Sequence, residues 1–497
     1  MLITLFNDII TRTMEQSLKK IHKIYVCGPT VYNFTHIGHA RTYTIVDIIN
    51  RIMSNLMNMN THLVMNITDL DEKIINRAKK ENTDWTSIAR TYEKSFFDSM
   101  AKLNVKLPNV IIRVSEVIPE IVKYIQVIID KGFAYTTHDG SVYFDTDAYV
   151  REGYVASDLA EDDHSELALT IIMQKRNIKD FALWKGRGTD EVGFDVEFTY
   201  GGFRVKNRGV PGWHIECSSM IHKTLGNEID VHFGGIDLKF PHHHNEIVQA
   251  NAYHHPAYHP TFKKSWCKEF LHVGHLCIAG LKMSKSLKNF TTVDEALKTI
   301  NPNQLRWMFV THKWRDQMDF CDDTIEHAKV FDSTITNFFN RIVNYPFDRL
   351  DVKFNEKEVE LSQYYSTVKT KIMANLFAFE FDLAARLIAE LINKTNTYIS
   401  VDRPNEHLVR KIYDWLMYLV GVLGFNYQTG CTDSTADIMN VLIDARSSLR
   451  ELTRDKTVPK EVKQKLFEIL DKERNISLKE IGITLQDTKE SSSWFKN

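Results

Sequence analysis

The chain has 497 residues, which is too long for one ordinary domain and suggests roughly three or four. Hydrophobic residues make up 43% and charged residues 25%, a balance typical of a soluble globular protein with ample core. The net charge of −2 gives no global signal for nucleic-acid binding, so any RNA contact would have to come from a local surface.

Composition also argues against membrane and secreted classes. No apolar run is long enough to span a bilayer, so we expect no membrane association. Residues 1–12 are apolar but lack a basic leader and a small-residue cleavage site, so we expect no signal peptide. Six cysteines scattered over this length do not form a disulfide framework, which favours reduced thiols and a cytoplasmic location.

The first third of the chain alternates between strand and helix patterns. Residues 23–28 (KIYVCG) form a short β-branched and aromatic run, and 40–57 carry apolar residues at helical spacing. Residues 62–67 predict a second strand and 71–80 a second helix. This strand–helix–strand unit predicts a parallel sheet, in which ligands bind beyond the carboxyl ends of the strands. Residues 27–39 would lie there.

An insertion splits this sheet. Residues 116–131 predict a helix, and 133–145 predict a hairpin that turns at Asp139 and Gly140. The acidic stretch 156–167 predicts an exposed loop, after which strand patterning resumes near residues 231–235. From about residue 320 onward the pattern is almost wholly helical, with 377–399 amphipathic throughout and 430–437 the best linker candidate.

Residues 35–41 (THIGHAR) follow a strand and a loop and open a helix. Gly38 lets a flat ring approach the backbone closely, and the amino end of a helix favours phosphate. His36 and His39 are three residues apart, so they fall on one side of a helical turn and can donate hydrogen bonds to phosphate oxygens. A histidine-rich helix cap explains this motif about equally well when it is taken alone.

Residues 282–286 (KMSKS) form a lysine-serine loop after the sheet, here called the KMSKS loop. Lys282 and Lys285, with Ser284 between them, are suited to neutralise a triphosphate and a leaving pyrophosphate, although such a loop is usually just solvated. The two motifs in this order resemble the HIGH and KMSKS motifs of the class I aminoacyl-tRNA synthetases. That resemblance implies that ATP binds together with Mg²⁺.

Cysteines, histidines and a glutamate gather in three further segments, and these are the residue types that bind zinc. If a helix begins near Pro241, His242 and Glu246 stack on one face, and the next two histidines point about 100° and 200° away. Cys27 and Cys217 supply two more ligands. Taken singly, each of these residues is more simply a buried thiol or a capping histidine.

Four motifs resemble the cysteinyl-tRNA synthetase family in the family's order: YVCGPTVY (25–32), NITDLDEKII (66–75), GWHIECSSM (212–220) and FPHHHNEIVQ (240–249). The resemblance covers nearly the whole chain. It implies an α/β fold with a split Rossmann-like parallel-sheet catalytic domain, an insertion, an α-helical bundle and a small C-terminal anticodon-binding module. The boundaries expected are 1–115 and 206–265 for the catalytic halves, 116–205 for the insertion, 266–320 for the KMSKS and stem-contact region, 321–430 for the bundle and 431–497 for the last module.

The resemblance also implies a reaction and its site residues. Members of the family activate L-cysteine with ATP and transfer it to tRNA(Cys), and the resemblance implies a monomer. One zinc ion per chain would be held by Cys27, Cys217, His242 and Glu246, and would bind the substrate thiolate. Thr68 and Trp213 would line the amino-acid pocket, while Gly234 and Asp237, together with His36, Gly38, His39, Lys282, Ser284 and Lys285, would contact the nucleotide. For Trp213, simple core packing is the alternative.

Three positions depart from the family pattern: Phe233 replaces the first glycine of an HGGG run, His244 replaces a glutamate, and Lys288 replaces a glycine. Phe233 would narrow a loop near the nucleotide, and Lys288 would add charge beside the triphosphate. Trp494, near the end of the chain, could stack on an RNA base or merely anchor the tail.

Three rival functions stay open from the sequence alone. A ligase that joins activated cysteine to a small amine would keep the same motifs but dispense with the anticodon module. A catalytically idle homologue could serve as an RNA-binding or scaffold protein, although loss of a motif histidine, lysine or zinc ligand would be expected there. An unrelated nucleotidyltransferase would not need the KMSKS loop or the paired cysteines.

Overall fold

The computed structural model describes residues 20–155, 174–262, 264–278, 280–282, 290–348, 353–400, 403–427, 435–455, 457–472, 483–487 and 492–496. The acidic loop 156–167 and the residues Ser284, Lys285 and Lys288 lie outside these ranges, as do the side chains of Lys282 and Trp494. Two compact units make up the chain, residues 1–427 and 428–497.

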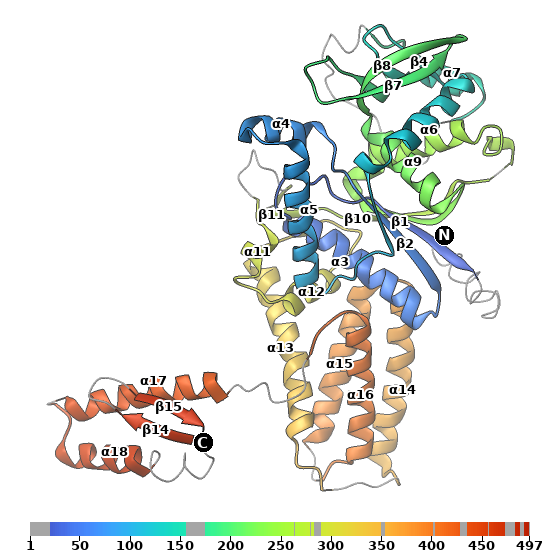
Figure 1. The fold of residues 1–497 in the computed structure, drawn as a ribbon. Helices are drawn as coiled ribbons and strands as arrows, with labels where there is room; N and C mark the ends of the chain where they lie inside the picture. The colour runs from blue at the N-terminus through green and yellow to red at the C-terminus, as the bar shows by residue number, and fades with distance from the viewer. Residues whose placement is uncertain are drawn as a thin grey trace. The chain divides into compact units, whose positions relative to one another are not determined.

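The first unit contains a five-stranded sheet that is parallel throughout, with strand order β10-β9-β1-β2-β3. These strands span Ile21–Val26 (β1), Asn60–Ile67 (β2), Val110–Arg113 (β3), Ile229–Gly235 (β9) and Cys267–Val273 (β10). β1 pairs with β2 on one side and with the distant β9 on the other (Figure 1). The predicted βαβ unit and the split parallel sheet are therefore confirmed.

Helix α3 connects β1 to β2 and spans Ile37–Arg51. It begins three residues before the predicted start at residue 40 because His36 caps it, with its Nδ1 accepting a hydrogen bond of 3.3 Å from the His39 amide. The last turn, Ile52–Leu56, is a π-helix. Helix α4 (Glu72–Glu81) follows β2 closely as predicted, and α5 (Trp85–Lys102) leads to β3.

The segment between β3 and β9 forms a second, antiparallel sheet with order β4-β5-β6-β8-β7. The predicted hairpin is confirmed as β4 and β5, and the left-handed Gly140 (φ +84°) makes its turn. The helices and strands of this segment are α6 (Ile118–Asp130), β4 (Ala134–Thr136), β5 (Val142–Phe144), α7 (Thr146–Arg151), β6 (Ala182–Gly186), β7 (Phe194–Tyr200) and β8 (Phe203–Pro211). Helix α9 (Trp213–Leu225) returns the chain to β9.

Two short helical turns and α10 follow β9, and then the chain reaches a small mixed sheet. The turns are Ile236–Leu238 and Lys239–His243, and α10 spans His244–Tyr253. The small sheet comprises β11 (Leu276–Ile278), β12 (Leu281–Lys282) and β13 (Met318–Asp319), with α11 (Val293–Ala296) and α12 (Pro302–Val310) between the last two. Buried Arg41 of α3 donates to the carbonyls of Gly274 (3.0 Å), His275 (2.7 Å) and Asp316 (2.8 Å), which fixes α3 against this region.

Four long helices complete the first unit: α13 (Asp322–Asn344), α14 (Glu356–Phe377), α15 (Phe381–Ile399) and α16 (Glu406–Val422). The helix predicted over 377–399 is shorter than expected. Phe379 adopts a φ of +57°, which cannot continue a right-handed helix, so α14 ends before it and α15 begins after it. The bundle shares one hydrophobic core with α3 and α12.

The second unit contains α17 (Thr435–Arg454), α18 (Lys460–Lys472) and an antiparallel pair, β14 (Ile483–Asp487) and β15 (Ser492–Lys496). The strand pair was not predicted, because the sequence pattern here suggested helix almost throughout. The linker predicted at 430–437 overlaps α17 at its last residues, and the rest of it lies outside the described residues. None of the helices in the described part of the chain has the length and apolar character to cross a membrane.

Candidate functional site

A cleft opens at the carboxyl ends of β1, β2 and β9, where a parallel sheet places its ligand sites. Eight of the residues singled out from the sequence line it: Cys27, His36, His39, Thr68, Trp213, Cys217, Asp237 and His242. Glu246, Gly38 and Gly234 do not line it. The structure thus brings together residues from segments that are far apart in the sequence.

The floor of the cleft holds a group of four possible metal ligands, here called the cleft-side quartet: Cys27, Cys217, His242 and Glu246. Their ligand atoms all lie within 4.8 Å of one another, and all four residues are buried. The Cys27 and Cys217 sulfurs are 3.8 Å apart, and His242 Nε2 lies 3.0 Å from Glu246 Oε1. This spacing, reached from separate segments of the chain, suits a small metal ion.

The residues of the quartet shift one another's pKa values. Burial alone would raise the pKa of the Cys217 thiol, but the Cys27 thiol and His242 lower it to about 6. Burial would lower the pKa of His242, yet Cys217 and Glu246 raise it to about 10. His232 and His242 overcome the effect of burial on Glu246 and hold the pKa of that carboxyl well below its usual range. These shifts favour negative charge on Glu246 and Cys217 beside the positive charge of His242, and anionic donors suit a divalent cation.

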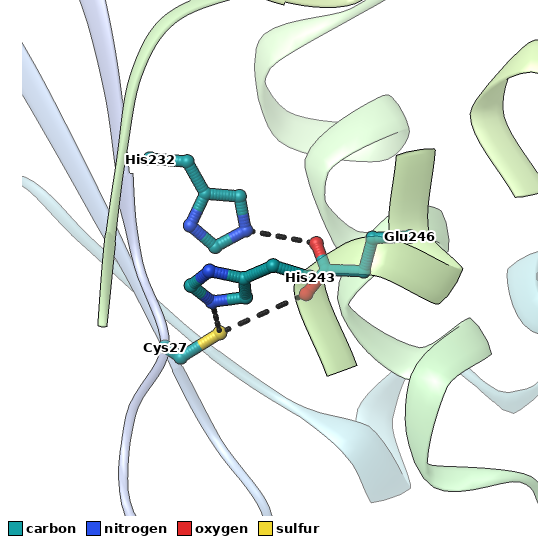
Figure 2. A group of neighbouring side chains, drawn as sticks. All are labelled: Cys27, His232, His243 and Glu246. Carbon is teal, nitrogen blue, oxygen red and sulfur yellow. Dashed lines mark hydrogen bonds and ion pairs between the residues drawn. The ribbon is translucent and has the colours of Figure 1, made fainter. Parts of the chain in front are cut away.

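A second group shares Cys27 and Glu246 but replaces the other two ligands by His232 and His243; we call it the buried-side quartet. Figure 2 shows that His232 and Cys27 approach different oxygens of the Glu246 carboxylate, at 2.8 and 3.9 Å. His243 Nε2 lies 3.4 Å from the Cys27 sulfur, and its Nδ1 lies 2.8 Å from His272 Nε2. Neither His232 nor His243 lines the cleft, and both are fully buried.

His242 is held on its other side by residues of α9. Its Nδ1 lies 3.1 Å from His214 Nδ1, so its Nε2 is left to face Glu246 and the cysteines. The Trp213 ring stacks on the His242 ring, with centroids 4.4 Å apart and an interplanar angle of 25°. Trp213 is 39% exposed and lines the cleft, so the core-packing alternative for this residue is wrong.

The other wall of the cleft is formed by the start of α3. The His36 and His39 rings stack with centroids 3.7 Å apart, as their spacing on one helical turn suggested. Burial lowers the pKa of His39 to about 4, so this imidazole is neutral near pH 7. Its Nδ1 is buried and has no hydrogen-bond partner within the described residues.

The chain on both sides of the KMSKS loop is described. On one side, the loop begins at Lys282, which is the last residue of β12. On the other, the Val293 amide donates to the Thr35 carbonyl (2.9 Å), and the Phe290 ring packs edge-on against His36 at 5.3 Å. The chain that resumes at Phe290 after the KMSKS loop is therefore hydrogen-bonded, through the backbone of Val293, to the start of α3.

Two residues near β9 are placed differently from expectation. Phe233 is fully buried in the hydrophobic core and does not line the cleft, so it does not narrow the nucleotide region. A Cβ on Gly234 would lie 2.7 Å from Cε1 of His243, which shows that this glycine gives room to the buried histidine. His244 begins α10 and packs against Phe240.

The sequence analysis missed His232, His243 and His272 as neighbours of the ligand group. His243 and Glu246 are three residues apart, a spacing that places both on one side of a helix, so this spacing was a signal for His243. For His232, its place near the carboxyl end of β9 was a second signal, since that sheet edge already contained the other candidates.

Comparison with known proteins identifies the group to which the chain belongs. Residues 13–330 match the family described as tRNA synthetases class I (C) catalytic domain. The chain is 52% identical over 98% of each sequence to the Cysteine--tRNA ligase of Acanthamoeba polyphaga mimivirus. It is 38% identical to that of Encephalitozoon cuniculi, over 99% of this chain and 98% of the other. The chain belongs to the cysteine–tRNA ligase family.

The fold of this cysteine–tRNA ligase family member is also found among solved structures. The Mycobacterium tuberculosis methionyl-tRNA synthetase in complex with methionyl-adenylate aligns with a TM-score of 0.60 over 81% of this chain and 91% of that one. At 13% identity this likeness concerns the fold alone. The expected class I architecture is confirmed, and the alternative of an unrelated nucleotidyltransferase is wrong.

Proposed function

We propose that the protein is a cysteine–tRNA ligase that works in two steps. The carboxylate of L-cysteine attacks the α-phosphorus of ATP, which forms cysteinyl-adenylate and releases pyrophosphate. The terminal ribose hydroxyl of tRNA(Cys) then attacks the cysteinyl carbonyl, which releases AMP. The observation that carries this proposal is the cleft-side quartet on the floor of the same cleft that His36 and His39 line.

Zinc is the ion that fits the cleft-side quartet. Two sulfurs, one imidazole nitrogen and one carboxylate oxygen are a donor set that zinc prefers. Three of the four residues line the cleft, so a substrate atom can reach an ion held there, whereas His232 and His243 of the buried-side quartet are shut off from the cleft. We therefore assign the ion to the cleft-side quartet, and we assign His232 and His243 to its support.

Selection of cysteine over serine follows from this chemistry. The two amino acids have nearly equal shapes, and shape alone discriminates such small differences by only about 1–3 kcal/mol. When bound, zinc would take a substrate thiolate as a further ligand far better than a neutral hydroxyl. Trp213 and Thr68, which line the cleft beside the quartet, would orient the rest of the substrate.

ATP would bind along the wall formed by the start of α3. His36 and His39 would donate hydrogen bonds to phosphate at the amino end of this helix, beside Gly38. Asp237 lines the cleft beyond β9 and would contact the nucleotide, as we also propose for Gly234, although Gly234 does not line the cleft. Lys282, Ser284 and Lys285 would stabilise the pyrophosphate as it leaves, with Mg²⁺ accompanying ATP.

The remaining assignments rest on family membership. The described region contains no group placed as a nucleophile, so we assign catalysis to positioning and charge neutralisation. Residues 428–497 would bind the anticodon, with Trp494 as the candidate for base stacking. Relatives match over nearly their whole length, which favours tRNA over a small amine as acceptor. We propose a monomer that works in the cytoplasm.

ATP–pyrophosphate exchange by the purified protein tests this proposal, with cysteine and serine compared and zinc quantified in the same preparation. Exchange with cysteine alone, at one zinc ion per chain, is the expected result. Absence of exchange with cysteine despite bound zinc would favour the idle-homologue alternative and overturn the proposed function.

A further inference from the structure

We infer that three residues on the α4 side of the cleft receive the single-stranded 3′ end of tRNA: Tyr32, Phe34 and Lys73, here called the rim patch. All three line the cleft that contains the cleft-side quartet. This inference rests on the proposed function, because it assumes that tRNA is the acceptor. It assigns named residues to the acceptor strand.

The rim patch combines a flat apolar surface with a cation. The Phe34 ring is 52% exposed and packs edge-on against Tyr92, with centroids 5.2 Å apart and an interplanar angle of 83°. The Lys73 ammonium lies 5.6 Å from the centre of the Tyr32 ring. An aromatic face beside a positive charge is the pairing that binds a stacked base and its phosphate.

The backbone that presents Phe34 is held by α4. The Arg77 guanidinium donates to the Tyr32 carbonyl at 2.7 Å and to Asn33 Oδ1 at 2.9 Å. The same guanidinium lies 4.4 Å over the Tyr92 ring, on which Phe34 packs. Phe34 is therefore exposed on a fixed support, which lowers the entropy cost of binding a base.

Helix stability does not explain the choice of lysine at position 73. Lys73 lies in the first turn of α4, where its amide donates to the capping Asp71 carboxylate at 2.7 Å. A cation in the first turn is opposed by the helix dipole, which favours acidic residues there. The neighbouring Glu72 carboxylate accepts hydrogen bonds from two residues of the insertion, Arg187 at 2.8 Å and Lys185 at 3.3 Å.

The charge of the cleft points to a phosphate ligand at this rim. Lys73 is the one lysine or arginine among the described residues that line the cleft, and Asp237 is the one carboxylate among them. The phosphates of ATP already have their expected partners at the start of α3 and in the KMSKS loop. The rim patch is therefore available to the other phosphate-bearing substrate, the acceptor strand.

Three variants test the inference. Lys73→Gln removes the charge, and Phe34→Leu keeps an apolar side chain but removes the flat ring. Lys80→Gln is the matched control, because Lys80 is an exposed lysine in the last turn of the same helix and does not line the cleft. For each protein, cysteine activation is measured by pyrophosphate exchange, and transfer is measured in a single turnover from preformed adenylate to tRNA(Cys).

We expect the transfer efficiency of Lys73→Gln and Phe34→Leu to fall at least ~5-fold, the lower end for a lost base stack. This loss in transfer should exceed any loss in activation by a similar factor. The salt dependence of tRNA binding should weaken by about one counterion for Lys73→Gln, and Lys80→Gln should transfer as the wild type does. Equal losses in both steps would place an ATP phosphate at the rim patch and overturn the inference. If wild-type protein charges tRNA but all three variants match it, the inference alone fails; if wild-type protein charges no tRNA, the proposed function fails.

Discussion

The two sides of Glu246 make an instructive comparison. On one side, Glu246 Oε1 meets His242 at 3.0 Å, near the sulfurs of Cys27 and Cys217, and these three residues line the cleft. On the other, Glu246 Oε2 meets His232 at 2.8 Å, and His243 Nε2 lies 3.4 Å from the Cys27 sulfur (Figure 2). Both sides offer four ligand atoms at metal-binding spacing, but only the first is open to a substrate.

This difference teaches that ligand spacing alone does not identify a site that performs chemistry. A catalytic or selective metal site needs an open position, whereas a closed set of ligands gives only structure. The buried side has the features of an outer shell, because a histidine that bonds the free oxygen of a ligating carboxylate fixes its orientation. Variants on the two sides should therefore have unequal effects.

The largest effect is expected for Cys217→Ser, which replaces a sulfur of the cleft-side quartet by a hydroxyl. Zinc content should fall well below one ion per chain, and cysteine-dependent exchange should fall by more than the roughly 10- to 100-fold typical of a lost outer partner. Inductively coupled plasma analysis and pyrophosphate exchange measure the two quantities together.

His243→Gln is the matched variant on the buried side, since His243 also contacts Cys27. It should retain one zinc ion per chain and most of its cysteine activation. A zinc-free His243→Gln protein, or a fully active Cys217→Ser protein with zinc bound, would reverse the assignment of the two sides.

His232→Gln sharpens the comparison by removing the outer partner of Glu246. The loss of its 2.8 Å contact should leave the carboxylate less well oriented, so zinc affinity should fall about 10- to 100-fold. Competition with a chelator measures this affinity. An unchanged affinity would mean that His232 does not orient Glu246.

The nucleotide side of the cleft predicts a pH effect on stability. Burial lowers the pKa of His39 from 6.5 to about 4, so the unfolded chain takes up a proton more readily than the folded protein between these values. Above pH 6.5 the imidazole is neutral in both states, so His39 does not make the free energy of unfolding depend on pH. As the pH falls toward 4, proton uptake by the unfolded chain lowers the free energy of unfolding, by about 1–2 kcal/mol at pH 5. Urea unfolding at pH 7.5 and 5 should show a smaller pH difference for His39→Asn than for the wild type; an equal difference would contradict the assignment.

A small effect is expected at Trp213, which stacks on His242 but is no proposed ligand. Trp213→Ala should raise KM for cysteine roughly 2- to 10-fold, because an aromatic pair contributes about 0.5–1.5 kcal/mol. Trp213→Phe should recover most of the affinity, while zinc content stays unchanged in both. A loss of stability without a change in KM would mean that the ring supports His242 and does not contact the substrate.

Much of the fold and the ligand group could be predicted from the sequence. The βαβ pattern placed Cys27 and Thr68 directly after two adjacent parallel strands, so their meeting at one sheet edge followed from topology. The four-residue spacing of His242 and Glu246 likewise predicted their shared helical face, which the 3.0 Å contact shows.

Other features depend on contacts that no local pattern contains. The 3.4 Å approach of His243 to Cys27 joins segments that are 216 residues apart, and the left-handed Phe379 breaks a helix whose apolar periodicity continues through it. The strand pair at the end of the chain is polar and short, so its pattern is weak. Tertiary packing decides each of these cases.

X-ray absorption at the zinc edge tests the central claim most directly, because it counts the sulfurs around the ion. The cleft-side quartet supplies two sulfur ligands and the buried-side quartet supplies one. We expect two sulfurs at about 2.3 Å in the free protein, a third when cysteine is added, and no change with serine. A single sulfur that does not increase with cysteine would place the ion on the buried side and contradict the account.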